Sequence, residues 1–324
     1  MKRKLKKKPI IILAIIIILI ISSIFGIKRS IEIKNYHKTY EYKFLQLEYT
    51  MEEFKIIDKL STESKDYLLT VEYNRRIPKL IEEKYFMEKN LEKYIGYFDK
   101  ESDLTKIVAI INVGRDNAPY TDTKKADLSK NELMLVNKYN YLDNTYDGAN
   151  MESVGVKYSY GSNQKLDSVA FDQFKKMFND AKDEGLTLII NSSYRSYEEQ
   201  ENLYERYKKN KGEEYADSIA ARPGYSEHQT GYAMDIITYD ANIDTFDSTD
   251  EFRWLQDNAY KYGFILRYPK DKDYITGYEY ESWHFRYVGL KAAKYIHEND
   301  ITFDEYYAYF IEGDTNEKEE ESAN

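Results

Sequence analysis

The sequence predicts a mixed fold of helices and strands over residues 131–312, preceded by an apolar helix and a largely helical region. Two neighbouring patterns are the main evidence. A capped amphipathic helix begins at Asp167 and ends at Gly185, and a short buried strand over residues 186–191 follows it directly. Length and composition agree, because 324 residues that are 42% hydrophobic can form one sizeable core with an appendage.

The first element is an apolar run over residues 10–27, which six basic side chains precede. As a helix it would reach ~27 Å, close to the thickness of a bilayer core. Because basic flanks stay in the cytoplasm, residues 1–29 are predicted to be a cytoplasmic stub and a single-pass anchor in the cell membrane. The lipid bilayer would then be a partner, and the remaining chain would be extracellular. A cleaved signal peptide is the competing interpretation, although its apolar region is usually shorter and ends in small residues.

The second region, residues 30–130, is predicted to be mainly helical. Thr50 and Glu53 have the spacing of a capping box, which opens a helix. Residues 105–114 are rich in β-branched side chains and are expected to form a strand that ends at Gly114. No residue pattern here indicates chemistry, and His37 is interpreted as a surface residue.

The third region, residues 131–312, holds the remaining elements. Ser196 and Glu199 form a second capping box, so a helix starts just after the 186–191 strand. The other predicted elements are an extended segment at 134–141, a helix from a capping box at 248–251 to Gly263, strands at 264–268 and 283–288, and a helix at 289–298. Residues 313–324 are acidic and are predicted to be a disordered tail.

Composition narrows the possible chemistry. The chain has no cysteine, so a transition-metal site must be built from His, Asp and Glu. Only four histidines are present, which gives weight to any motif that holds two of them. The net charge is −10 although residues 1–30 carry eight basic and no acidic side chains. The remainder is therefore strongly acidic, and nucleic acid is excluded as an expected partner.

Two short segments carry the candidate chemistry. Residues 226–235 contain His228 and Asp235, and residues 281–284 contain Glu281 and His284. Catalytic zinc usually takes three protein ligands and leaves a fourth position for water. Two imidazoles and an aspartate fill the three places, and Glu281 is left as the carboxylate that handles protons. Arg195 lies at a strand-to-helix junction, where anions are favoured.

These segments read Ser-x-His-x-x-Gly-x-Ala-x-Asp and Glu-x-Trp-His, with Ser-x-Tyr-Arg at 192–195. The pattern resembles the VanY-type zinc D-alanyl-D-alanine carboxypeptidases of the M15 peptidase family, over about residues 133–310. The resemblance implies an α+β fold whose antiparallel sheet holds one Zn²⁺ per chain, as in Hedgehog amino-terminal domains. It also implies removal of the terminal D-alanine from peptidoglycan stem peptides. The implied zinc ligands are His228, Asp235 and His284, the implied base is Glu281, and the implied substrate-binding residues are Arg195, Gln200 and Ser226, with Arg195 also catalytic.

Two positions depart from the commonest family pattern: Ser193 replaces a frequent Gly, and Ser282 replaces a frequent Pro. The first is expected to affect the turn that aims Arg195, because Gly permits backbone angles that Ser resists. Two alternatives to the implied activity stay open. One is an L,D-carboxypeptidase or an endopeptidase with the same zinc centre, and the other is an inactive wall-binding or sensor module. The sequence does not determine the oligomeric state.

Overall fold

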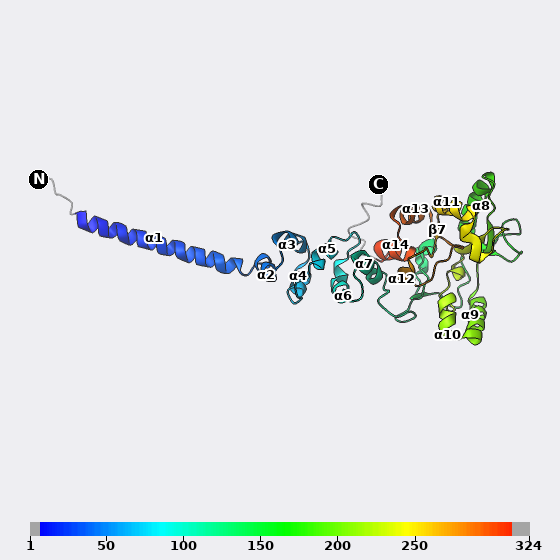
Figure 1. Cartoon of the computed structure of the whole chain (residues 1–324), viewed down its shortest axis with the longest axis horizontal. Coiled ribbons are helices and arrows are strands. Elements are labelled where there is room, and N and C mark those ends of the chain that lie inside the picture. Colours follow the sequence, from blue (N-terminus) through cyan, green and yellow to red (C-terminus); the bar gives the residue numbers. More distant parts are fainter. Residues whose placement is uncertain (1–6, 313–324) are drawn as a thin grey trace. The chain divides into compact units, whose positions relative to one another are not determined.

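The computed structural model describes residues 7–312, with side chains from Ile15 onward. The chain divides into two compact units, Met1–Val108 (unit 1) and Ala109–Asn324 (unit 2), and the division falls inside helix α7 (Leu104–Asn112) (Figure 1). The predicted basic stub over residues 1–6 and the predicted acidic tail over 313–324 lie outside the described residues.

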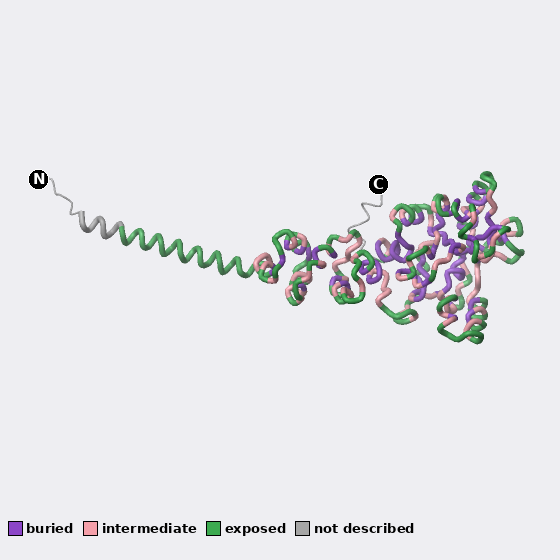
Figure 2. The backbone as a smooth tube through the Cα atoms, in the orientation of Figure 1, coloured by how far each residue is buried: buried purple, intermediate pink, exposed green. Residues whose placement is uncertain are grey.

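Unit 1 is helical. Thr50 and Glu53 form the expected capping box, with Thr50 Oγ1 accepting from the Glu53 backbone N–H. The described side chains of α1 are exposed, whereas the shorter helices that follow include buried residues (Figure 2). Among these are the apolar side chains of Phe44 and Ile57. Its helices are α1 (Lys7–Tyr36), α2 (Tyr40–Gln46), α3 (Met51–Ile57), α4 (Thr62–Leu68), α5 (Arg76–Ile81), η1 (Glu88–Asn90), α6 (Leu91–Gly96) and the start of α7.

The predicted transmembrane anchor is contradicted. Among the described residues, no helix combines the length and the apolar character needed to cross a bilayer. The described side chains of α1 form an apolar run from Ile15 only to Ile27, because Lys28 and Arg29 follow. A spanning helix needs ~20 predominantly apolar residues. The prediction of a membrane-spanning helix was therefore wrong, and so was the single-pass location in the cell membrane that depended on it.

Residues 105–114 were expected to be a strand, but they lie mostly in helix α7. The Asp103 side chain accepts a hydrogen bond from the Lys106 backbone N–H and so supports the first turn. Five consecutive residues, from Ile107 to Ile111, are buried. A helix buried on several sides has no polar face, so its sequence looks like that of a buried strand.

Unit 2 contains a four-stranded antiparallel sheet in the order β5-β6-β8-β7, as the resemblance implied. Its strands are β1 (Lys124–Lys125), β2 (Asn140–Tyr141), β3 (Met151–Ser153), β4 (Lys165–Asp167), β5 (Ile189–Ser192), β6 (Ala233–Ile237), β7 (Phe264–Leu266) and β8 (His284–Tyr287). Its helices are η2 (Leu128–Leu133), α8 (Ser168–Asp183), α9 (Tyr197–Lys211), α10 (Glu213–Ile219), η3 (Glu227–Thr230), η4 (Ile243–Ser248), α11 (Asp250–Asn258), η5 (Ala259–Tyr262), α12 (Asp273–Thr276), α13 (Leu290–Asn299) and α14 (Phe303–Phe310).

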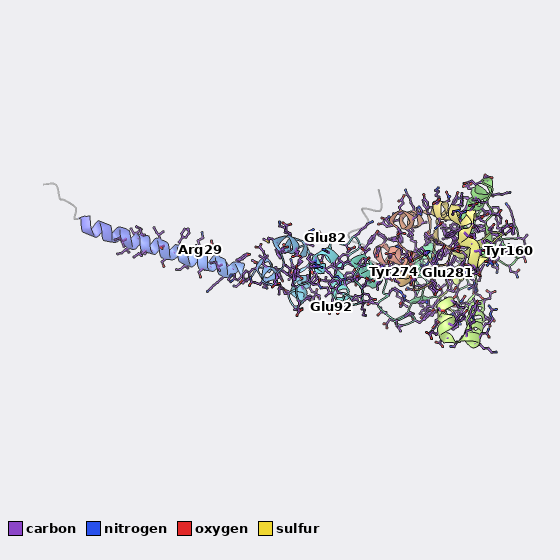
Figure 3. All side chains as sticks on the ribbon, viewed as in Figure 1. Arg29, Glu82, Glu92, Tyr160, Tyr274 and Glu281 are labelled. Carbon is purple, nitrogen blue, oxygen red and sulfur yellow. The ribbon has the colours of Figure 1, made fainter. Side chains whose placement is uncertain are left out.

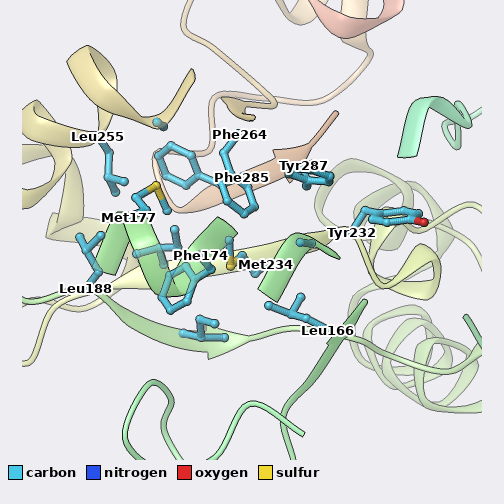
Figure 4. Close-up of a cluster of buried hydrophobic side chains, with 14 of the residues drawn as sticks. Leu166, Phe174, Met177, Leu188, Tyr232, Met234, Leu255, Phe264, Phe285 and Tyr287 are labelled. Atoms are coloured by element: carbon cyan, nitrogen blue, oxygen red, sulfur yellow. The ribbon is translucent and has the colours of Figure 1, made fainter. Parts of the chain in front are cut away.

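The core lies between one face of this sheet and helices α8 and α11. Met234 of β6 and Phe285 of β8 point into it, where they join Phe174 and Met177 of α8 and Leu255 of α11 (Figure 4). Because side chains alternate along a strand, the neighbours of Met234 in β6 and of Phe285 in β8 point to the opposite face of the sheet. That second face of the sheet is where the site is built.

Local signals placed most helices of unit 2 correctly. Asp167 caps α8 by accepting from the Val169 N–H, and Ser196 and Glu199 form the capping box of α9. The cap of α11 is one residue later than expected, at Thr249, because the Glu251 side chain instead accepts from the Thr187 N–H. Helices α10 and α14 were not predicted.

Candidate active site

Two central strands place the first pair of site residues. Asp235 of β6 lies directly opposite His284 of β8 in the antiparallel register. Their strand neighbours Met234 and Phe285 point into the core, so Asp235 and His284 share the other face of the sheet. Residues about fifty positions apart in sequence are thereby brought into contact.

His228 reaches the same point from the short helix η3, just before β6. Gly231 ends η3 with φ +78°, a left-handed conformation that turns the chain into the strand. His228 Nδ1 lies 2.6 Å from the carbonyl oxygen of Ser193. Because a carbonyl only accepts, Nδ1 carries the proton, and the lone pair of Nε2 faces Asp235 Oδ1 at 3.5 Å.

His228, Asp235 and His284 form a group that fits a metal ion. One ligand atom from each lies within 4.8 Å of the others, and all three residues are buried. Asp235 Oδ1 is 3.4 Å from His284 Nδ1 and has no hydrogen-bond partner within the described part of the chain. Two imidazoles and one carboxylate are typical zinc donors, and the orphaned buried oxygen fits a bound cation.

The charges around this group agree with a cation site. Burial opposes ionisation of Asp235, but the two imidazoles outweigh it and hold the pKa of Asp235 well below its usual range. Burial also opposes protonation of His284, yet the neighbouring carboxylates of Asp235, Glu227 and Glu281 raise its pKa to about 9. The surroundings of the group therefore favour a bound positive charge.

Glu281 lies beside the His-Asp-His group but is not one of its three members. Its Oε2 is 3.5 Å from His284 Nδ1, in a turn where the Glu281 carbonyl accepts from the His284 N–H. Burial raises the pKa of Glu281 to about 7. A carboxylate with a pKa near neutrality can both accept and return a proton. Figure 3 shows Glu281 within the body of unit 2, whereas Tyr160 lies at its outer edge.

A cleft of about 260 Å³ opens over the group. Arg195 lines it, with Nη1 donating to Gln200 Oε1 at 2.7 Å and Nη2 donating to Ser192 Oγ at 3.1 Å. Gln200 in turn donates to the Ala221 carbonyl, which fixes this wall. Ser226 also lines the cleft, at the start of η3. The structure brings together every site residue that the sequence indicated: Arg195, Gln200, Ser226, His228, Asp235, Glu281 and His284.

Sequence reasoning missed the residues behind the group. Glu227 is buried, with Oε2 3.4 Å from His284 Nε2. Burial opposes its ionisation, but the charges of Arg267 and Arg286 hold the pKa of Glu227 well below its usual range. Tyr268 also lines the cleft, with its ring centroid 4.9 Å from that of His284. In the sequence, the one indication that Glu227 belongs to the site is that it directly precedes His228.

The departure at Ser193 does not distort the turn before Arg195. Ser193 is not among the residues with positive φ, so the conformational freedom of Gly is not needed there. Its hydroxyl donates to Gln164 Oε1 at 2.6 Å, and its carbonyl holds His228. Ser282 is buried beside Trp283 and contributes no ligand. The other two histidines, His37 and His297, stack on Tyr42 and Tyr260, and neither lines the cleft.

A buried His-Asp-His group with an adjacent glutamate, in a cleft on an antiparallel sheet, defines a metal-dependent hydrolase centre. A sequence model of the VanY family, described as D-alanyl-D-alanine carboxypeptidase, matches residues 163–290. A putative carboxypeptidase of Bacillus subtilis strain 168, YodJ, is 45% identical over 200 residues, which cover 58% of this chain and 73% of that protein. The chain belongs to the VanY family of carboxypeptidases.

Two further relatives support this assignment. A D-alanyl-D-alanine carboxypeptidase of Enterococcus faecalis strain V583 is 33% identical, over 59% of this chain and 71% of its own length. Among solved structures, the LdcB LD-carboxypeptidase is 43% identical. Its structure is described as revealing the molecular basis of peptidoglycan recognition. Its TM-score is 0.55, and the match covers 58% of this chain and 91% of that one.

Proposed function

We propose that this protein is a zinc-dependent D-alanyl-D-alanine carboxypeptidase that removes the terminal D-alanine from peptidoglycan stem peptides. The observation that carries the proposal is the convergence of His228, Asp235 and His284 to within 4.8 Å, with Glu281 3.5 Å from one of them. Membership of the VanY family gives the substrate class. His228 Nε2, His284 Nδ1 and a carboxylate oxygen of Asp235 would hold the zinc.

Zinc in such a site polarises a carbonyl group and lowers the pKa of water. Glu281 accepts the proton of the attacking water and passes it to the departing D-alanine amine. Its burial favours this role, because burial raises the pKa of Glu281 to about 7. A carboxyl group with that pKa can both accept and release a proton.

Arg195 binds the negative charge of the substrate, either the terminal carboxylate or the oxygen of the scissile carbonyl as charge develops on it. The support is its place on the cleft wall, where Gln200 and Ser192 fix the planar guanidinium. A fixed guanidinium suits a carboxylate, because its parallel N–H groups match the two oxygens. Gln200 and Ser226 complete the substrate-binding wall.

An L,D-carboxypeptidase is the second candidate, because the LdcB structure is named for that activity. The two activities differ in the bond cleaved: the last bond of a pentapeptide stem joins two D-alanines, whereas that of a tetrapeptide stem joins an L centre to D-alanine. The family model and the E. faecalis relative both carry the D-alanyl-D-alanine name, which favours that activity.

The deciding experiment incubates the zinc-loaded full chain with tetra- and pentapeptide stems and weighs the products by mass spectrometry. Loss of one alanine from the pentapeptide, with the tetrapeptide left intact, is the expected result. Loss from the tetrapeptide alone would establish the L,D activity instead. An internal cut would indicate an endopeptidase, and two intact substrates with zinc bound would leave a binding or sensor module.

A further inference from the structure

A buried row of charged side chains leads from helix α14 to the back of His284. Arg267 Nη1 donates to Asp304 Oδ2 at 2.6 Å, and Arg267 Nε donates to Glu227 Oε1 at 2.7 Å. The side chains of Arg267 and Glu227 are 0% exposed, and that of Asp304 is 3% exposed. Asn137 Nδ2 donates to the other Asp304 oxygen at 2.9 Å. The last helix of the described chain is thereby connected to the residue next to His228.

His284 stands between this row and the metal position. Its Nδ1 lies 3.4 Å from Asp235 Oδ1, and its Nε2 lies 3.4 Å from Glu227 Oε2. His284 Nε2 and Glu227 Oε2 are both buried, and over residues 7–312 neither makes a hydrogen bond, so this ion-pair contact is the polar interaction that joins them. An ionised carboxylate can only accept, so a proton on Nε2 faces Glu227 and leaves Nδ1 to hold the metal.

Stability alone is a poor explanation for this row. Burying paired charges brings little net stabilisation, because the cost of removing them from water offsets their attraction. Glu227 is moreover held from two sides, since Arg286 Nη1 lies 3.5 Å from the same oxygen that Arg267 contacts. The consequence of this arrangement is a carboxylate fixed behind a metal-binding imidazole. Carboxylates in that position orient the ring and select its tautomer.

We infer that Glu227 is a positioning residue for the zinc ligand His284, and that Arg267 and Asp304 hold Glu227 in place. Zinc affinity then depends on α14, although neither Arg267 nor Asp304 lines the cleft. The inference rests on the proposed function, because it takes His228, Asp235 and His284 as the zinc site.

The test compares Asp304→Asn with Glu305→Gln in the full chain. Both carboxylates are buried on α14, but Glu305 accepts from Thr302 and Tyr309, whereas Arg267 donates to Glu227 and Asp304. Zinc dissociation constants come from competition with a chromophoric chelator, and the absorption spectrum of the Co²⁺-substituted protein reports ligand geometry. Asp304→Asn is expected to weaken zinc binding ~10–100-fold and to shift the Co²⁺ bands. Glu305→Gln is expected to lower the melting temperature and leave both metal readouts unchanged.

Glu227→Gln provides a second, isosteric variant in case Asp304→Asn does not fold, and the same loss of affinity is expected for it. Wild-type zinc affinity and Co²⁺ spectra in the folded variants would overturn the inference, even if their melting temperatures fell. Equal metal losses in Glu305→Gln would also overturn it, because the effect would then be general to α14. A wild-type chain that binds no zinc would instead refute the proposed function on which the inference rests.

Discussion

Burial determines the chemistry of single residues in this cleft. Glu281 differs from an ordinary surface glutamate because its surroundings penalise the charged form and raise its pKa to about 7. The pKa of His228 shifts in the opposite direction, because burial lowers it and favours the neutral ring that a metal requires. The sequence names these residue types, but their proton affinities come from the folded environment.

Replacing Glu281 with Gln should strongly lower turnover and spare the metal. The amide keeps the shape of the side chain but cannot accept a proton, and loss of a general base lowers kcat by ~10²–10⁴-fold. D-alanine release and the zinc content of the purified variant measure the two effects.

The matched control is Glu279→Gln, which changes an exposed glutamate two residues away. It should retain full activity. A Glu281→Gln variant that binds zinc and hydrolyses at the wild-type rate would refute the assigned role.

At the scale of elements, the site depends on the turn between η3 and β6. Gly231 has φ +78°, and a Cβ built there would lie 2.6 Å from Met151 Sδ. The turn must be tight, because His228 before it and Asp235 after it have to face the same point. A residue with a side chain at this position would be strained in its backbone and would also press against Met151.

Gly231→Ala is therefore expected to destabilise the protein and to weaken zinc binding. Left-handed backbone costs an L-residue ~1–2 kcal/mol, and the contact with Met151 adds to that. Urea unfolding measures the stability, and isothermal calorimetry measures the zinc affinity.

Gly212→Ala isolates the backbone contribution. Gly212 has φ +92°, but nothing lies within 4 Å of its Cβ position. At φ +92° and ψ 167° its backbone is also in a region that only Gly adopts readily, so Gly212→Ala should lose stability while zinc affinity stays at the wild-type value. Equal zinc affinities in both variants would show that the η3-to-β6 turn does not position the ligands.

At the scale of the whole molecule, the two compact units predict separate responses to metal. His228, Asp235 and His284 all lie in unit 2, and they come together only when it is folded. A ligand that binds only the folded state stabilises it by about 2.7 kcal/mol at one hundred times its Kd.

Scanning calorimetry should thus show a zinc-dependent upward shift in the unfolding transition of unit 2 and none in that of unit 1. His228→Ala and His284→Ala should each remove the shift, because each deletes a donor. A zinc-induced shift that persists in both variants would place the metal elsewhere.

Structural features that depend on neighbouring residues were predictable from the sequence. The caps at Asp167 and Ser196 were predicted correctly, because a cap and the apolar spacing after it lie within a few residues. Residues 105–114 were assigned to a strand, because periodicity does not distinguish a buried helix from a buried strand. Helix α14 was missed although Thr302 and Glu305 form a capping box. The apolar run before Lys28 was given a membrane-spanning role that the described residues do not support.

By itself, the sequence determined the donor set of the site and the start of the helices that flank it. His228, Asp235, Glu281 and His284 were identifiable because zinc chemistry needs those residue types at such spacings. Only the tertiary structure decided how they meet and what stands behind them. The pairing of β6 with β8 and the row from Glu227 through Arg267 to Asp304 join distant segments. Such contacts depend on how the chain buries charge and apolar surface together, and no local pattern in the sequence encodes that.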